Sequence, residues 1–180
     1  MTPLKGKLIY KLITKQDGKI VLPDTAKNRS TSSMVVSIND NNSGVRSGDI
    51  IMHNMKYNPR EEHFILNGED HKIMDINDVF AKVIRAQIIP VNGWIFCKMI
   101  VPESAIAGVY KLKDCKEVVV CAIADDVKEM SIRIGGKYLL GEWCMEMHQI
   151  NFESDPNCYM FLKDKSLVAE VISDNVISMF

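Results

Sequence analysis

Apolar residues in this chain gather in short stretches that alternate with turn residues about every eight to twelve positions, which is typical of a small β-sandwich or barrel. The first half contains the candidate strands Lys7–Ile13, Met34–Ile38, Asp49–His53, Glu62–Leu66, Lys72–Ile76 and Val79–Ile84. The second half contains the candidate strands Trp94–Val101, Glu117–Ala124, Lys137–Trp143, Met147–Phe152, Cys158–Leu162 and Leu167–Ile172. We therefore expect an all-β fold.

Two local patterns sharpen this expectation in the first half. Leu8, Tyr10 and Leu12 alternate with Lys7, Ile9 and Lys11, which indicates a strand with one buried face, although Ile9 interrupts the pattern. Asn67-Gly68 is a strong signal for a tight hairpin turn. The stretch from Asp75 to Asp78 resembles a second turn, which leads into the last strand of this half.

The chain repeats itself at an interval of about 90 residues, the length of one small domain. Pro3, Gly6 and Lys11 recur 87 positions later as Pro90, Gly93 and Lys98. Longer blocks recur in the same order: Val45-Arg46-Ser47-Gly48 as Ile132-Arg133-Ile134-Gly135, and Ala81-Lys82-Val83-Ile84 as Ala169-Glu170-Val171-Ile172. We interpret this as a duplication that gives two domains, residues 1–87 and 88–180.

One segment of the first half is not typical of a strand. Residues 14–33 form a long polar stretch, and such loops in compact domains are usually functional or disordered. It contains one apolar island, Gly18-Lys19-Ile20-Val21-Leu22-Pro23, whose side chains gain about 1.5–3 kcal/mol each when buried. Two interpretations stay open: a short strand packed on its own domain, or a docking tripeptide for a hydrophobic groove on a partner.

The first half resembles the chaperonin-10 family, the co-chaperonin lids of the GroES type. Four motifs carry the resemblance in the family's order. They are the opening strand Pro3-Leu4 with Gly6-Lys7-Leu8-Ile9-Tyr10-Lys11, the loop motif Gly18-Lys19-Ile20-Val21-Leu22-Pro23, the motif Val45-Arg46-Ser47-Gly48-Asp49-Ile50-Ile51, and the closing segment from His71 to Ala81. The resemblance implies a GroES-like, partly open β-barrel whose mobile loop, residues 14–33, binds a chaperonin through Gly18, Ile20, Val21, Leu22 and Pro23.

The second half resembles the same family in a diverged form. Ile132-Arg133-Ile134-Gly135-Gly136 keeps the glycine of the family motif and loses its acid, and Cys158–Ile172 is similar to the closing segment. In its loop, Val109-Tyr110-Lys111-Leu112 interrupts the apolar tripeptide with a tyrosine and a lysine. Val109, Tyr110 and Leu112 are therefore weaker docking candidates than the residues of the first loop.

The chain also departs from the bacterial members of the family. Only Asn39-Asp40-Asn41-Asn42-Ser43-Gly44 stands where those members insert a roof hairpin, which leaves room for a turn and nothing more. Phage co-chaperonins also lack that roof, so a viral origin agrees with this feature.

The resemblance implies a co-chaperonin that caps the ATP-bound ring of chaperonin 60 (GroEL-type) and assists protein folding. Its partners would be that ring and further copies of itself in a homo-oligomeric ring. It would bind no cofactor of its own, because ATP belongs to the chaperonin and the chain has no phosphate-binding glycine loop. Family rings have seven subunits, so a two-domain chain either leaves domains outside the ring, meets a ring of other symmetry, or stacks both domains at one position.

Composition excludes several other classes. A net charge of −1 with scattered Lys and Arg gives no footprint for nucleic acid, and no apolar run has the roughly 20 residues that span a bilayer. Five unevenly spaced cysteines without a secretory leader indicate a reducing compartment, the cytoplasm or a host's cytoplasm. No Cys-x-x-Cys pair or nucleophile signature is present, so we expect no zinc site, no enzyme, core thiols and surface histidines.

A second hypothesis comes from a different class of protein. The duplicated barrel would serve as a structural ring or virion-assembly module that does not bind a chaperonin. The diverged second half favours this alternative, and the intact Ile20-Val21-Leu22 favours the lid.

Overall fold

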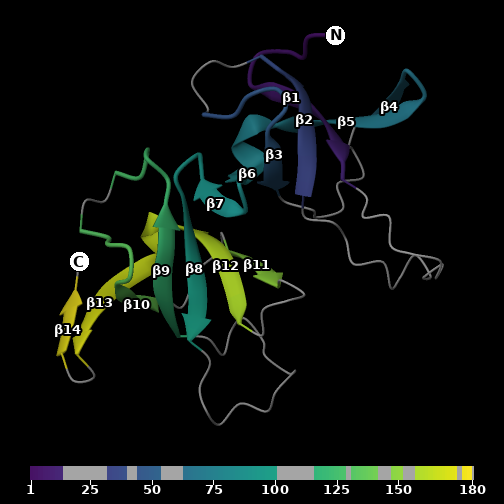
Figure 1. The fold of residues 1–180 in the computed structure, drawn as a ribbon. Helices are drawn as coiled ribbons and strands as arrows, with labels where there is room; N and C mark the ends of the chain where they lie inside the picture. The colour runs from purple at the N-terminus through teal and green to yellow at the C-terminus, as the bar shows by residue number, and fades with distance from the viewer. Residues whose placement is uncertain are drawn as a thin grey trace, which may run out of the picture. The chain divides into compact units, whose positions relative to one another are not determined.

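The computed structural model describes residues 1–13, 32–39, 44–53, 63–100, 116–128, 131–141, 147–151, 157–173 and 176–179. The chain divides into two compact units, Met1–Val91 and Asn92–Phe180 (Figure 1). Each unit is built around one antiparallel sheet. No helix of the described residues is long and apolar enough to cross a membrane.

The sheet of unit 1 has seven strands in the order β4-β5-β1-β2-β3-β6-β7. The strands are β1 (Lys7–Leu12), β2 (Ser32–Ile38), β3 (Ile50–His53), β4 (His63–Leu66), β5 (Glu69–Asp75), β6 (Val79–Ile84) and β7 (Gln87–Pro90). A 3-10 turn, η1 (Ile76–Asp78), joins β5 to β6, and the Asp75 carboxylate caps it by accepting a hydrogen bond from the Asn77 backbone. This is the turn that the sequence indicated between Asp75 and Asp78.

Burial in unit 1 follows the alternation of the first strand only in part. Leu8 and Tyr10 are fully buried in the hydrophobic core, and Leu12 packs against it. Ile9 points to the opposite face of the strand and is also buried. The prediction of one buried face is therefore correct for the core and wrong for Ile9, since both faces of β1 are covered there.

The β4–β5 hairpin confirms the turn that the sequence predicted. Asn67 and Gly68 form the two-residue turn, with φ of 53° and 79°. Positive φ at both central residues is the reason that Asn-Gly is favoured in such hairpins.

The sheet of unit 2 has the order β11-β12-β8-β9-β10-β13-β14. The strands are β8 (Trp94–Ile100), β9 (Glu117–Ile123), β10 (Lys137–Leu140), β11 (Met147–Asn151), β12 (Cys158–Lys163), β13 (Leu167–Ser173) and β14 (Val176–Met179). A 3-10 turn, η3 (Asp164–Ser166), precedes β13 as η1 precedes β6. When the strands of each unit are numbered from its own first strand, the two sheets have the same order.

The registers also agree between the units. The β1–β2 ladder shifts between Ile9 and Tyr10, and the β8–β9 ladder shifts between Phe96 and Cys97, the positions 87 residues further along. The β3–β6 ladder shifts between Met52 and His53, and the β10–β13 ladder shifts between Leu139 and Leu140. The similarity seen in sequence therefore extends to the irregularities of the strands.

The all-β prediction is confirmed, and each sheet is open, because its strands form a linear order that does not close into a barrel. The predicted strands are present with ends shifted by at most three residues, as where β5 begins at Glu69 rather than Lys72 and β10 ends at Leu140 rather than Trp143. The sequence analysis missed two edge strands: β7, at one edge of the sheet of unit 1, and β14, at one edge of the sheet of unit 2.

Candidate functional site

The predicted docking residues lie outside the described residues. This holds for Gly18, Ile20, Val21, Leu22 and Pro23 in the first segment. It also holds for Val109, Tyr110 and Leu112 in the second. The structure describes the strand ends between which each segment runs, and these ends define the root of each candidate loop.

The root of the first segment is a pair of neighbouring antiparallel strands. The chain leaves the sheet at the end of β1 and returns at the start of β2, where Leu12 pairs with Ser33 and Lys11 with Met34. The returning strand begins at Ser32, inside the range 14–33 that the sequence analysis assigned to the loop. The antiparallel pairing of β1 and β2 therefore holds the two ends of the intervening segment next to each other.

The second segment has an equivalent root in unit 2. The chain leaves at the end of β8 and returns at the start of β9, and Ile100 pairs with Glu117. Both candidate loops thus connect the first two strands of their unit.

Each root carries one ion pair between strands. In unit 1, Lys11 Nζ lies 2.9 Å from Glu69 Oε2, and the hydrogen bond and charge of this lysine lower the pKa of the Glu69 carboxyl. In unit 2, Lys137 Nζ lies 2.7 Å from Glu117 Oε2. These pairs are exposed or half-exposed, so solvent screens them and they contribute little to stability.

A buried polar contact at the root of the first segment was missed by the sequence analysis. Ser33 Oγ lies 2.7 Å from His53 Nε2, and both side chains are buried. The His53 ring also meets the Tyr10 ring edge-on, with 4.8 Å between centroids. Polar residue types at strand ends predict exposure, so no sequence signal pointed to this pair.

The cysteines and histidines that the sequence analysis considered as metal ligands or nucleophiles differ in burial. Cys97 is a core thiol as expected, whereas Cys121 is exposed. His53 and His71 are buried, so the expectation of surface histidines is wrong for these two, because each hydrogen-bonds within the protein. Within the described ranges, no three His, Cys, Asp or Glu side chains come together as metal ligands do.

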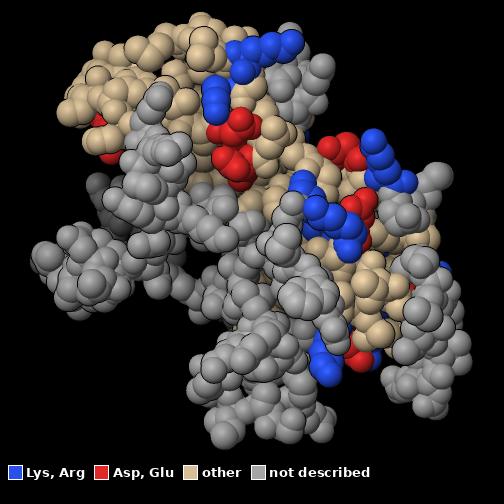
Figure 2. Space-filling model, turned by 180° about the vertical axis from the view of Figure 1, so that it is seen from behind, with Lys and Arg blue, Asp and Glu red and all other residues tan. Residues whose placement is uncertain are grey.

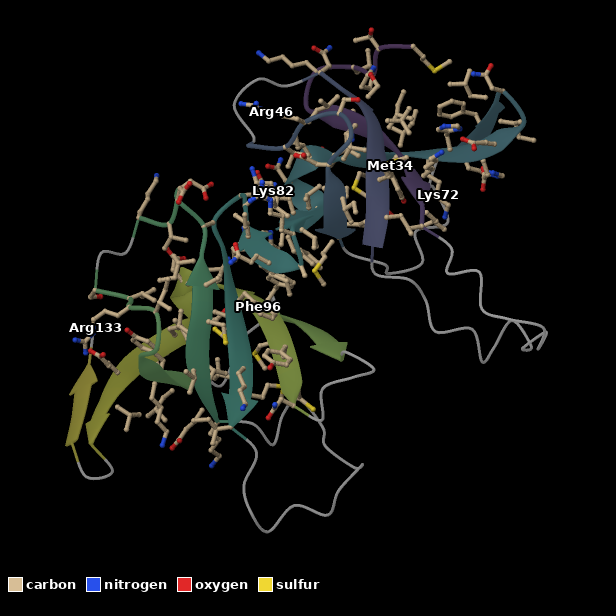
Figure 3. The ribbon with its side chains drawn as sticks, in the orientation of Figure 1. Met34, Arg46, Lys72, Lys82, Phe96 and Arg133 are labelled. Atoms are coloured by element: carbon tan, nitrogen blue, oxygen red, sulfur yellow. The ribbon has the colours of Figure 1, made fainter. Side chains whose placement is uncertain are left out.

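The strand residues beside the two arginine loops, residues 44–49 and 132–136, differ in charge between the units. Arg133 forms an ion pair with Glu170 of β13, and that pairing raises the pKa of the guanidinium. The equivalent position of β6 is Lys82, whose Nζ donates to the Gly44 carbonyl at 2.8 Å. Figure 3 shows Arg46 and Lys82 in unit 1 and Arg133 in unit 2.

On the face shown in Figure 2, Lys and Arg lie beside Asp and Glu rather than gathering by sign.

Comparisons with known proteins place the first unit in a family. The family model described as "Chaperonin 10 Kd subunit" matches residues 1–83. The co-chaperonin GroES of Rubrobacter xylanophilus is 33% identical over 85 residues, which cover 45% of this chain and 93% of that protein. The chain belongs to the chaperonin 10 family. The co-chaperonins GroES of Thermotoga maritima and Petrotoga mobilis are 34% and 36% identical, over 88 and 86 residues, and are covered to 92% and 93%.

Membership supports a chaperonin-10 role for the chain, and it confirms the resemblance that the four motifs indicated. The matched residues 1–83 run from the N-terminus into β6 and include the apolar island at 20–22. Almost the full length of each relative is accounted for by less than half of this chain.

Proposed function

We propose that this protein is a tandem co-chaperonin, which caps a GroEL-type chaperonin ring in its ATP-bound state and closes a chamber for protein folding. The observation that carries the proposal is the family match over residues 1–83, which includes the apolar segment Gly18-Lys19-Ile20-Val21-Leu22-Pro23. Ile20, Val21 and Leu22 would supply the apolar contact with the ring.

The root geometry supports a docking role for this segment. Because β1 and β2 pair at Leu12 and Ser33, the segment is presented from a fixed base on the sheet. An apolar tripeptide loses conformational entropy when it docks, so a single contact is weak and reversible. Several segments presented by one assembly raise the effective concentration and convert weak contacts into a usable affinity. We therefore propose a homo-oligomeric ring.

The second unit would be a diverged copy of the first. The equal strand orders and the matching register shifts favour a duplication over two unrelated domains. Its docking segment, with Val109, Tyr110 and Leu112, would contact the chaperonin weakly or not at all. ATP would be held by the chaperonin, so the chain would act without a cofactor and without catalysis, in the cytoplasm of its cell or host.

A binding experiment with a purified GroEL-type ring and ATP tests this function. The full chain is expected to co-sediment with the ring when ATP is present and to be released after hydrolysis. An Ile20→Ser/Leu22→Ser double variant should lose this binding, because two apolar contacts are replaced by hydroxyls. The matched Val109→Ser/Leu112→Ser variant should keep most of it.

Each other outcome is informative. Binding that survives in the Ile20→Ser/Leu22→Ser variant would move the contact to another surface. Absence of binding in the unmodified chain, with rings of the free protein visible by electron microscopy, would instead support the structural assembly module.

A further inference from the structure

The turn between β6 and β7 holds two residues in a backbone conformation that neither favours. Arg85 and Ala86 have φ of 48° and 64°, which lies in the left-handed region, and both residues are exposed. In this region the Cβ atom comes too close to the following carbonyl oxygen, and only glycine, asparagine and aspartate adopt it routinely. The connection from β6 to β7 is therefore strained at two consecutive positions.

Two other turns show how the chain builds a similar backbone without this strain. Asn67-Gly68 has φ of 53° and 79°, and Asn92-Gly93 has φ of 54° and 68°. In both turns the first residue is asparagine and the second is glycine, the pair that two-residue turns of this kind prefer. The unfavoured pair occurs at the turn that leads to the last strand of unit 1.

β7 is held in the sheet of unit 1 by a single neighbour. It lies at the edge of the sheet and, among the described strands, pairs only with β6, through four residue pairs. After the strand, Val91 donates a backbone hydrogen bond to the Phe80 carbonyl at 2.9 Å and packs in the core. β7 can therefore leave β6 without disrupting another ladder of the sheet.

Every copy of the chain carries the same strand and the same edge. When β7 of one copy pairs with β6 of another, the ladder and the Val91 contacts are the same as those within one chain. The connection is then extended, so Arg85 and Ala86 leave the left-handed region. Exchange thus relieves the strain at each connection, and it costs the entropy of association.

We propose that the outer edge of β6 is an interaction surface for a second copy of this chain, whose β7 fills the edge in the assembled protein. The inference rests on the self-association in the proposed function and identifies the surface that supplies it. It requires no contact with a chaperonin, so the full chain can be tested by itself.

The turn and its place in the chain suit this exchange. Short connections under strain favour the exchange of identical elements between copies. The four residues from Ile84 to Gln87 are exposed, so the turn can open without uncovering the core. Because β7 leads into β8 (Figure 1), the exchange joins unit 2 of one copy to unit 1 of its neighbour.

A pair of cysteines across β6 and β7 reports which copy fills the edge. Val83 pairs with Ile88, one position beyond the residues that flank the turn. Facing residues of an antiparallel ladder have Cα atoms about 4.5–5.5 Å apart, which a disulfide can span. The full chain with Val83→Cys/Ile88→Cys is prepared with and without an isotope label, and the two preparations are mixed in equal amounts, refolded together and oxidised.

Mass spectrometry of the disulfide-linked peptides distinguishes the two arrangements. Exchange between copies predicts linked pairs in which one peptide is labelled and the other is not. Pairing within one chain gives only pairs with a uniform label. If Val83→Cys/Ile88→Cys does not fold, Ile84→Cys/Gln87→Cys places the cysteines at exposed positions beside the turn.

The β4–β5 hairpin provides the matched control. Ile65→Cys/Asp70→Cys occupies the equivalent place beside the Asn67-Gly68 turn, and β4 is also an edge strand. Because asparagine and glycine adopt the backbone of this turn readily, its linked pairs should carry a uniform label in the same mixing experiment.

Two variants of the β6–β7 turn test whether strain drives the exchange. Arg85→Asn/Ala86→Gly installs the relaxed pair and should raise the concentration at which copies associate by at least about tenfold, because the closed turn is then favoured. Arg85→Pro fixes φ at about −65° and excludes the closed turn, so it should lower that concentration and increase the mixed-label pairs. Size-exclusion chromatography with light scattering measures the association.

Several results would overturn the proposal. If the protein associates and its linked pairs carry a uniform label, or are mixed no more often than in the control, the exchange is refuted and the proposed docking function still stands. Association that is unchanged in Arg85→Asn/Ala86→Gly would refute strain as its cause, and with it the proposal. A chain that stays monomeric at every concentration would refute the exchange as well, and binding to the GroEL-type ring would then decide the docking function by itself.

Discussion

Lys163 places its ammonium group 4.1 Å from the centroid of the Trp94 ring in unit 2. At the equivalent pair of strands in unit 1, Lys7 forms an ion pair with Asp75. Trp94 pairs with Lys163 in the β8–β12 ladder, and Lys7 pairs with Asp75 in the β1–β5 ladder. The same location in the two sheets therefore holds a cation–π contact in one unit and an ion pair in the other.

This difference predicts unequal effects of removing the two lysines. Lys163→Met keeps the apolar stem and removes the charge over a buried ring, so the free energy of unfolding of unit 2 should fall by about 1 kcal/mol. Lys7→Met removes an ion pair that is about two-fifths exposed on each side, and unit 1 should lose less than about 0.5 kcal/mol. Urea unfolding followed by tryptophan fluorescence reports unit 2, since Trp94 and Trp143 both lie there. Equal losses of unfolding free energy in the two units, measured by hydrogen exchange, would contradict this ranking.

Gly136 is expected to tolerate no side chain. A Cβ atom at this position would lie 2.6 Å from Tyr138 Cε2 and 2.8 Å from its hydroxyl oxygen. Tyr138 is fully buried and accepts a hydrogen bond from the Arg133 backbone, so its ring cannot move away without loss. Gly136→Ala should therefore destabilise unit 2 by about 2–3 kcal/mol, as overpacking does.

Gly135 provides the matched control for this substitution. Its φ is +82° and nothing lies near its Cβ position, so Gly135→Ala should cost only the backbone strain of about 1 kcal/mol. Amide exchange at Arg133 should accelerate in Gly136→Ala and not in Gly135→Ala. The opposite order would show that the Tyr138 ring adapts and that the backbone dominates.

Two aspartates of one turn should affect the pH dependence of unit 1 with opposite signs. Burial alone would raise the pKa of Asp75, but hydrogen bonds from Asn77 and Lys7 outweigh it and lower that pKa in the folded state. Its stabilising contribution is therefore present above the ordinary carboxyl pKa of about 4 and is lost as the pH falls through the folded value. Asp75→Asn should weaken unit 1 at pH 7 by up to about 1 kcal/mol, which is typical of a lost cap.

Asp78 is the counterpart with the opposite sign. Burial and then the charge of Asp75 raise the pKa of the Asp78 carboxyl, so its ionisation opposes folding above about pH 4. Asp78→Asn should therefore stabilise unit 1 slightly at pH 7 and have no effect at pH 3. Chemical unfolding at the two pH values measures both variants, and a stabilising Asp75→Asn would refute the capping role.

The comparison of sequence and structure shows which signals carry information. Asn67-Gly68 predicted its hairpin because positive φ needs such residues, whereas the β6–β7 turn uses Arg85 and Ala86 at φ of 48° and 64°. Neither residue signals a turn, so the sequence pattern gives no sign that Gln87–Pro90 is a strand. The missed strand lies next to a turn that departs from the usual residue preferences.

Part of the candidate site could likewise be predicted from the sequence, and part could not. The apolar island at 20–22 was recognisable because three large apolar side chains interrupt a polar stretch. The contact between Ser33 and His53 was not recognisable, because the two residues are 20 positions apart and their burial depends on strand pairing. Tertiary pairing of this kind leaves no periodic signal in the sequence.

Restoring the apolar tripeptide in the second docking segment should strengthen chaperonin binding under the proposed function. The triple substitution Val109→Ile, Tyr110→Val and Lys111→Leu rebuilds Ile-Val-Leu in a segment whose root, Ile100 paired with Glu117, matches that of the first. A second competent segment on each chain adds contacts without adding a second association step, so the dissociation rate from the ATP-bound ring should fall about tenfold or more. Surface-based kinetics measures this rate, with the Ile20→Ser/Leu22→Ser background showing whether the rebuilt segment docks alone. An unchanged rate in both backgrounds would mean that unit 2 does not reach the chaperonin.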